Sequence, residues 1–257
     1  PNGKSTLIEL QSHSADIFVL AGYGKILKKE IINIPKIFTI NLHAGKLPEY
    51  RGSSPMNWAL INGEKNYHIS IIKVDDGVDT GNVLIQKKYN ILPNDTISDL
   101  HEKTNKGFAN LLIELFTKIN NNSYKEIKQD QQQANYYTLR RPEDGFILWE
   151  LEKAENIHNR IRALTKPYPC AFTYFNRKKI LLIKSRLTKG CFIGEPGRIY
   201  RISKNNGLLV AAKDKCLWIK DAVYGDTDIS LIDKVNRYDR FARIQDLFHD
   251  LYSKNTG

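Results

Sequence analysis

The stretch Phe38-Thr39-Ile40-Asn41-Leu42-His43 decides the fold class of this chain. It begins as an apolar strand pattern and ends in polar side chains. The continuous apolar run Ile17–Ala21 precedes it and is typical of a buried parallel strand. Open α/β sheets form their ligand crevice at the carboxyl ends of strands. We therefore expect an α/β fold with Asn41 and His43 in a site.

The chain on either side of this strand has the rhythm of an α/β domain. A short helix is predicted over residues 26–32, and further strands over 69–74 and 83–91. Ser54 reads as an N-cap with Pro55 at the first helical position, and Thr96-x-x-Asp99 resembles a capping box. The helix after that box carries core residues at helical spacing, namely Leu100, Phe108, Leu111, Leu112, Leu115, Phe116 and Ile119.

An acidic glycine loop, Asp75-Asp76-Gly77-Val78-Asp79-Thr80-Gly81, follows the predicted strand 69–74. An amide, an imidazole and a carboxylate can together run an acyl transfer, so Asn41, His43 and Asp79 are the candidate catalytic residues. The loop lacks the ligand number and terminal Glu of an EF-hand, and we predict no metal site. A carboxylate loop that closes over a ligand is the alternative.

Composition predicts a globular protein without a membrane span. The chain has 257 residues, 41% of them hydrophobic, which is enough for one large or two modest domains. The three cysteines Cys170, Cys191 and Cys216 are widely spaced, which predicts reduced thiols in a cytoplasmic protein. Residue 1 is Pro and no signal-peptide pattern is visible, so the chain looks truncated or processed at its start.

The sequence pattern changes after a polar stretch at 120–136, the best linker candidate. We predict one domain over 1–137 and a second over 138–257. A helix is expected at about 151–164, followed by short strands over 170–175, 179–186, 197–203, 207–212 and 215–221 and a tail helix over 237–252. Asn206-Gly207 is a strong hairpin signal, and closely spaced strands predict a small antiparallel barrel or sheet.

Charge is concentrated in the second half. Residues 1–137 contain 16 Lys and Arg against 14 Asp and Glu, whereas residues 138–257 contain 23 against 14, which gives +9 of the net +11. A basic surface of this kind favours an anionic partner, either a nucleic acid or a small phosphorylated substrate. A merely lysine-rich surface is the equally weighted alternative.

These motifs resemble the formyltransferases that use 10-formyltetrahydrofolate, over most of the chain. Asn41, His43 and Asp79 look like the catalytic trio of that family, at its spacing. The resemblance implies that two segments hold the folate donor, one bordering the pterin and one closing over it. They comprise Leu20, Ala21, Gly22, Tyr23, Ile26 and Leu27, and Val74, Asp75, Asp76, Gly77 and Val78.

The resemblance also implies an acceptor-binding loop. Lys46-Leu47-Pro48 stands where the family has Ser-Leu-Leu-Pro, and Ala44-Gly45-Lys46 departs from the usual wording there. The implied substrate-binding residues are Lys46, Leu47, Pro48, Tyr50 and Arg51. The implied fold is a Rossmann-like formyltransferase domain, incomplete at its N-terminus, followed by a small OB-like β-barrel.

Two branches of the family carry a C-terminal barrel. The segments at 55–64, 140–145 and 157–169 look more like the sugar-nucleotide N-formyltransferases, so we expect formyl transfer to the amine of a nucleotide-linked amino sugar. The alternatives are transfer to initiator methionyl-tRNA, which the basic second half favours, and a non-catalytic nucleic-acid-binding module. The sequence leaves the oligomeric state open, with a homodimer among the alternatives.

Overall fold

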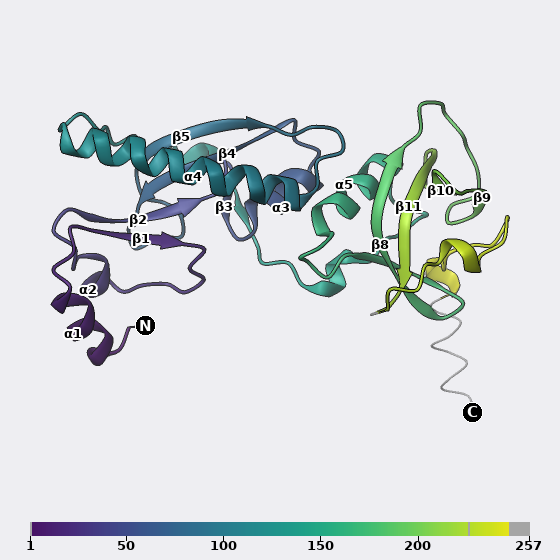
Figure 1. The fold of residues 1–257 in the computed structure, drawn as a ribbon, viewed down its shortest axis with the longest axis horizontal. Coiled ribbons are helices and arrows are strands. Elements are labelled where there is room, and N and C mark those ends of the chain that lie inside the picture. Colours follow the sequence, from purple (N-terminus) through teal and green to yellow (C-terminus); the bar gives the residue numbers. More distant parts are fainter. Residues whose placement is uncertain (1, 226, 247–257) are drawn as a thin grey trace. The chain divides into compact units, whose positions relative to one another are not determined.

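The structure is a computed structural model that describes residues 2–225 and 227–246 (Figure 1). The chain divides into two compact units. One contains the chain up to Ala59 together with Lys65–Ile91 and Leu100–Leu139. The other contains Leu60–Glu64, Leu92–Asp99 and the chain from Arg140 onward. In the described part of the chain, none of the helices combines the length and the apolar character that crossing a membrane requires.

A four-stranded mixed sheet forms the centre of the first unit, in the order β1-β2-β4-β5. Its strands are β1 (Ile17–Ala21), β2 (Phe38–His43), β4 (Asn66–Lys73) and β5 (Val83–Asn90). β1 runs parallel to β2, whereas β2–β4 and β4–β5 pair antiparallel. The strand predicted over residues 38–43 is therefore confirmed, and it lies inside the sheet with Ile40 fully buried.

β1 differs from its prediction in burial. It pairs with β2 in parallel as expected, but it stands at the end of the sheet order, and Val19 is 41% exposed. A continuous apolar run predicts a strand that is covered on both faces. The described residues leave the outward-facing positions of β1 partly open, so the prediction of a buried strand is wrong here.

The helices of this half are α1 (Lys4–Ser12), α2 (Lys29–Ile32), α3 (Pro55–Ile61) and α4 (Ile97–Asn120). The capping box at the start of α4 is confirmed, because the Asp99 carboxylate accepts from both the backbone N–H and the hydroxyl of Thr96. Figure 1 shows α4 lying along β4 and β5. Gly107 makes this close approach feasible, since a Cβ there would lie 2.7 Å from the Ile69 side chain of β4.

The segment predicted as a linker is part of the first unit. Ile127 forms a β-bridge with Val83, and a 3₁₀ turn follows at Gln131–Gln133. β6 (Tyr136–Tyr137) then pairs in parallel with β3 (Arg51–Gly52) in a two-stranded sheet. The polar composition that indicates a solvated linker instead supplies hydrogen-bonding side chains, which is why sequence pattern alone misassigned this stretch.

The second unit consists of a helix and a five-stranded antiparallel sheet. A 3₁₀ turn at Pro142–Gly145 precedes α5 (Ala154–Leu164). The sheet order is β7-β8-β11-β10-β9, with the bounds Ala171–Phe175, Lys178–Leu187, Cys216–Tyr224, Gly207–Ala211 and Ile199–Ser203. The predicted strands are thus confirmed, and Gly207 takes the positive φ of +80° that its hairpin turn requires.

Two details of this unit differ from expectation. β7 and β9 are the two ends of the strand order, and no strand pairing of the described residues closes the sheet into a barrel. The tail helix predicted over 237–252 is not helical over 237–243. In this stretch the backbone of Arg240 forms a β-bridge with Arg198, and the Phe241 ring stacks on Trp149 with 5.3 Å between the ring centroids. Phe241 is fully buried, so this apolar residue of the predicted helical face packs into the core from an extended segment. Residues 247–257 lie outside the described residues.

Candidate active site

The three candidate catalytic residues come together at the carboxyl end of β2. Asn41 and His43 are two residues apart on that strand, so their side chains point to the same face of the sheet. Asp79 comes from the loop that links β4 to β5. Asn41 Nδ2 donates to Asp79 Oδ1 at 3.3 Å, and His43 Nδ1 lies 3.5 Å from Asp79 Oδ2. The side chains of His43 and Asp79 are only 6% and 12% exposed, so water screens their interaction weakly.

Both imidazole nitrogens of His43 have a partner. Nε2 lies 2.6 Å from the carbonyl oxygen of Tyr50. A carbonyl oxygen can only accept, so Nε2 must carry a hydrogen. Nδ1, which faces Asp79, is then the nitrogen that can gain or lose a proton. The fold therefore sets the tautomer of this histidine and directs its proton exchange toward the carboxylate.

Asp79 is held from two directions. The backbone N–H of Gly52 donates to its Oδ2 at 2.8 Å, in addition to the contacts that Asp79 makes with Asn41 and His43. Its backbone has φ +55°, a left-handed conformation that is uncommon outside glycine. The loop before it is closed by Asp75, whose Oδ1 accepts from the Gly77 N–H and the Thr80 hydroxyl at 3.1 and 2.6 Å.

The segment that was predicted to border the pterin lies beside the trio. Strand register pairs Leu20 with Asn41 and Ala21 with Leu42, so the end of β1 is adjacent to the site. The chain then turns at Gly22, which has φ +67°. Beyond the turn the apolar side chains of Tyr23 and Ile26 are 43% and 73% exposed, and Leu27 is half-buried.

The acidic loop is the other segment that is predicted to hold the folate donor. Val74 is anchored, because its N–H donates to the Thr39 carbonyl at 2.8 Å, whereas Asp75, Asp76, Gly77 and Val78 are exposed. The Val78 side chain is 47% exposed. The exposed apolar side chains on both segments can contact a planar ring system.

An ion pair ties the acidic loop to α2. Lys29 Nζ lies 2.6 Å from Asp76 Oδ2. The hydrogen bond and the charge of Asp76 raise the pKa of Lys29. Both side chains are more than half exposed, so this pair adds little stability.

The predicted substrate loop is mixed in its accessibility. Lys46 is exposed and pairs with Glu49 at 2.5 Å. Pro48 is half-buried, whereas Leu47, Tyr50 and Arg51 are buried. These buried residues build the loop, and Lys46 is the member of the predicted set whose charged group faces solvent.

Sequence reasoning missed two contributors to the site. One is the Gly52 N–H, because backbone groups leave no trace in composition. The other is Gln129, whose amide donates to the backbone carbonyls of Asp79 and Gly81 at 2.8 and 2.6 Å. Gln129 stands in the Asn- and Gln-rich stretch that the sequence pattern predicts to be a linker, so no sequence signal separates it from its neighbours.

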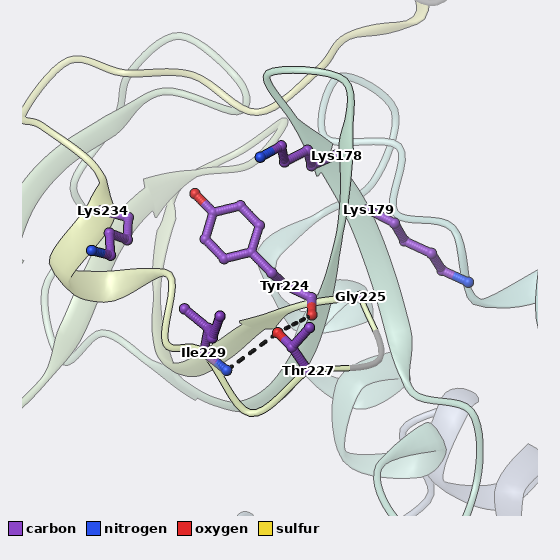
Figure 2. Close-up of a pocket in the computed structure, with 7 residues that line it drawn as sticks. All are labelled: Lys178, Lys179, Tyr224, Gly225, Thr227, Ile229 and Lys234. Carbon is purple, nitrogen blue, oxygen red and sulfur yellow. Dashed lines mark hydrogen bonds between the residues drawn. The ribbon is translucent and has the colours of Figure 1, made fainter.

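A separate cavity of about 600 Å³ lies in the second unit. Figure 2 shows its lining: Lys178, Lys179, Tyr224, Gly225, Thr227, Ile229 and Lys234. The Thr227 hydroxyl donates to the Tyr224 carbonyl and accepts from the Ile229 N–H. The lining offers cations and an aromatic ring without an acid–base pair, so it does not compete with the trio as a centre for acyl transfer.

Comparison with known proteins places this geometry in a family. The formyl transferase model matches residues 4–115, and the model of the formyl transferase C-terminal domain matches residues 140–229. The bifunctional polymyxin resistance protein ArnA of Wigglesworthia glossinidia brevipalpis is 38% identical over 221 residues, which are 86% of this chain. The methionyl-tRNA formyltransferase of Clostridium tetani is 36% identical over 211 residues, which are 82% of this chain.

A solved structure agrees with these relatives. The N-formyltransferase from Helicobacter canadensis, in complex with folinic acid and dTDP-3-aminofucose, is 26% identical, with a TM-score of 0.63 over 80% of this chain and 73% of that one. The chain spans 33% of the length of the ArnA relative and 67% of the Clostridium tetani enzyme. Both family models and the fold agree, and the chain belongs to the formyltransferase family.

Proposed function

We propose that this chain transfers a formyl group from 10-formyltetrahydrofolate to the primary amine of a nucleotide-linked amino sugar. The observation that carries the proposal is the contact of Asn41, His43 and Asp79 at the end of β2. A non-catalytic nucleic-acid-binding module has no use for a buried imidazole in contact with a half-buried carboxylate to which a half-buried amide donates a hydrogen bond.

The donor would occupy the space between the end of β1 and the acidic loop. Tyr23, Ile26 and Val78 have exposed apolar surface for its ring system, and the register of Leu20 with Asn41 supports this location, because it brings the end of β1 beside the strand that carries Asn41 and His43. The donor supplies a formyl group on a nitrogen: the acceptor amine bonds to the formyl carbon, the bond to the donor nitrogen breaks, and that nitrogen takes up a proton.

The trio then has distinct roles. The Asn41 amide has two hydrogens, of which one is directed at Asp79, so the other can donate to the oxyanion that develops on the formyl group. His43, with Nε2 fixed by Tyr50, exchanges its proton through Nδ1. Asp79 stabilises the protonated imidazole. It also accepts the proton that the amine loses, so that this proton leaves the reacting centre.

Support for a nucleotide-sugar acceptor comes from the relatives. The Helicobacter canadensis N-formyltransferase has dTDP-3-aminofucose bound. On this chain, Lys46 is the charged and exposed residue of the acceptor loop, and an ammonium group suits a phosphorylated ligand. An amine next to such an anchor is the acceptor class that the site fits best.

Initiator methionyl-tRNA is the second candidate. It is favoured by the charge of residues 138–257, which contain 23 Lys and Arg against 14 Asp and Glu. The methionyl-tRNA formyltransferases of several clostridia are 33–36% identical to this chain. A tRNA contact would make affinity fall steeply with salt, because each neutralised phosphate releases counterions.

The test offers labelled 10-formyltetrahydrofolate to the full-length protein with a panel of amino-sugar nucleotides and with charged initiator tRNA. We expect label on a sugar amine, at a rate that changes little between 50 and 200 mM salt. Label on tRNA with steep salt dependence would select the second candidate. Folate binding without transfer to any amine would contradict the proposed function.

A further inference from the structure

Gln129 connects a buried cation to the backbone of the catalytic loop. Its side chain is buried, and every hydrogen-bonding position of its amide is occupied. Nε2 donates to the carbonyls of Asp79 and Gly81, at 2.8 and 2.6 Å. Oε1 accepts from Arg51 Nε and Nη2, at 3.0 and 2.9 Å. The amide therefore has one orientation only, because the reverse orientation would set donors against the guanidinium.

Arg51 is fully buried, and neutral groups surround its charge. Besides Gln129, its Nη1 donates to the Gln131 amide oxygen and to the Tyr136 hydroxyl, each at 2.8 Å. Within the part of the chain that the structure describes, Arg51 forms no ion pair with a carboxylate. A cation in a low-dielectric setting polarises the amide that it touches, which strengthens the two bonds on the far side of Gln129.

Those two bonds hold the backbone at Asp79 and at Gly81, on both sides of Thr80. With φ +55°, Asp79 keeps an uncommon conformation that its surroundings must maintain. The residue after Arg51 reaches the same carboxylate, since the Gly52 N–H donates to Asp79 Oδ2 at 2.8 Å. Gln129 thus links the segment at residues 51–52 to the turn at residues 79–81. The position of the Asp79 carboxylate depends on how these two segments lie relative to each other.

We propose that Gln129 is a positioning residue: through Arg51 and the backbone of the 79–81 turn it holds the Asp79 carboxylate against Asn41 and His43. The proposal rests on the proposed formyl transfer. Gln129 does not reach the reacting atoms, because its contacts are two backbone carbonyls and a guanidinium. Its role is expressed in the rate of the chemical step, with substrate affinity largely preserved.

The first test replaces Gln129 by Leu in the full-length protein, with Gln131→Leu as a matched control. Gln131 gives Arg51 an acceptor but has no bond to the Asp79 turn. We expect Gln129→Leu to lower kcat by roughly 10- to 100-fold with KM near the wild-type value. Gln131→Leu should cost less than about threefold, since it leaves both Gln129 bonds in place. Equal losses in the two variants would overturn the proposal, because the Arg51 cluster alone would then explain them.

A double-mutant cycle separates positioning from general damage. If Gln129 acts through the Asp79 carboxylate, Gln129→Leu should change kcat by less than about threefold in an Asp79→Asn background, since coupled residues are not additive. A full additional loss there would contradict the proposal. Gln129→Glu serves if the Leu variant does not fold: it keeps a partner for Arg51 but sets a carboxylate oxygen against the two carbonyls, and it should show the same loss of kcat.

A readout that needs no turnover tells this inference apart from the proposed function. The Gly52 N–H donates to Asp79 Oδ2, so its hydrogen exchange reports on the position of that carboxylate. Exchange at Gly52 should quicken in Gln129→Leu and stay at the wild-type rate in Gln131→Leu. Unchanged exchange in Gln129→Leu would refute the positioning role. A wild-type protein that shows no formyl transfer would contradict the proposed function alone.

Discussion

His43 Nε2 and the carbonyl oxygen of Tyr50 lie 2.6 Å apart, and this contact decides how the imidazole can work. The carbonyl fixes the hydrogen on Nε2 and leaves Nδ1 to exchange a proton beside Asp79. The contact depends on a residue without a side chain. A Cβ at Gly45 would lie 2.5 Å from His43 Nε2 and 2.6 Å from the Tyr50 oxygen, beside this contact and too close to both partners.

Gly45→Ala should therefore impair catalysis. A methyl group at this place must push the imidazole or the Tyr50 carbonyl aside, because real Cβ contacts are not that short. We expect kcat to fall at least about tenfold, which corresponds to about 1.4 kcal/mol of transition-state stabilisation. Steady-state kinetics of formyl transfer measure this, with circular dichroism to verify the fold.

Gly24→Ala is the matched control for that experiment. A Cβ at Gly24 would meet no atom within 4 Å, so the same chemical change should leave kcat near wild type. If Gly45→Ala and Gly24→Ala have equal activity, the His43–Tyr50 contact does not matter for the reaction.

Asn41→Ala should lower kcat by roughly 10²–10³, the usual effect of removing one oxyanion donor. Asn41 donates one amide hydrogen to Asp79, and the other is available to the developing oxyanion. Asn90→Ala, an exposed position at the end of β5, provides a control for the loss of an asparagine side chain. Near wild-type turnover of the Asn41 variant would remove this residue from the mechanism.

The strand that carries Asn41 and His43 could be predicted from sequence because its signals are local. Phe38–His43 combines an apolar run with a polar end, and both properties are visible in six residues. The hairpin at Gly207 was equally visible, since a two-residue turn has its own chemistry. Asp79 lies 36 positions after His43, so no local pattern links the two; the chemistry of the three side chains groups them, and the resemblance to a family agrees with that grouping.

Non-local hydrogen bonds account for what sequence reasoning missed. Gln129 is 50 residues from Asp79 and 78 from Arg51, and its neighbours are equally polar. Periodicity identifies apolar faces, but it assigns no partner to a polar side chain. Phe241 illustrates the converse: its helical spacing was real, yet tertiary packing against Trp149 uses it in an extended segment.

The three thiols should differ strongly in reactivity. Burial raises the pKa of Cys170, and it raises the pKa of Cys216 to about 11. Cys191 is exposed. At pH 8 a thiol reagent should titrate one cysteine rapidly in the native protein and all three after denaturation, since the thiolate is the reacting form. Cys191→Ser should abolish the rapid phase, and rapid labelling that survives in this variant would contradict the burial of the other two.

Acid should destabilise the second unit through His158. Its Nδ1 contacts the Ser185 hydroxyl at 2.9 Å, and its Nε2 contacts the Pro93 carbonyl at 3.1 Å. Burial lowers the pKa of His158 below 6.5, and the charge of Arg162 adds to this, whereas the bond to Pro93 and the charge of Glu155 oppose it. The unfolded chain then binds more protons than the folded one in this range, so the free energy of unfolding falls with falling pH.

The measurement is the free energy of unfolding between pH 8 and pH 5. Stability should be constant above pH 7 and decline below about 6.5, by at most about 1.4 kcal/mol per pH unit for each histidine. Burial also lowers the pKa of His68 and His101, so they contribute with the same sign. His158→Gln should have a shallower decline than the wild type, and an identical slope would show that His158 does not titrate differently in the two states.

Asp79→Asn keeps the shape of the side chain and removes its charge. In the native site the carboxylate accepts from the Gly52 N–H and from Asn41, and it faces Nδ1 of His43. An amide has one oxygen, so its NH₂ group would be set against at least one of these donors. We expect kcat to fall by more than 10²-fold while KM for the folate donor stays within about threefold, because orientation and proton transfer act in the transition state.

Asp76→Asn tests whether any acid of this loop has the same effect. Asp76 is exposed and pairs with Lys29 at the surface, where an ion pair contributes little to stability. Its removal should change kcat by less than about threefold and should abolish the rise in the pKa of Lys29. If Asp79→Asn turned over normally but bound the folate donor poorly, Asp79 would be a binding residue, and proton transfer would have to be assigned to another group of the site.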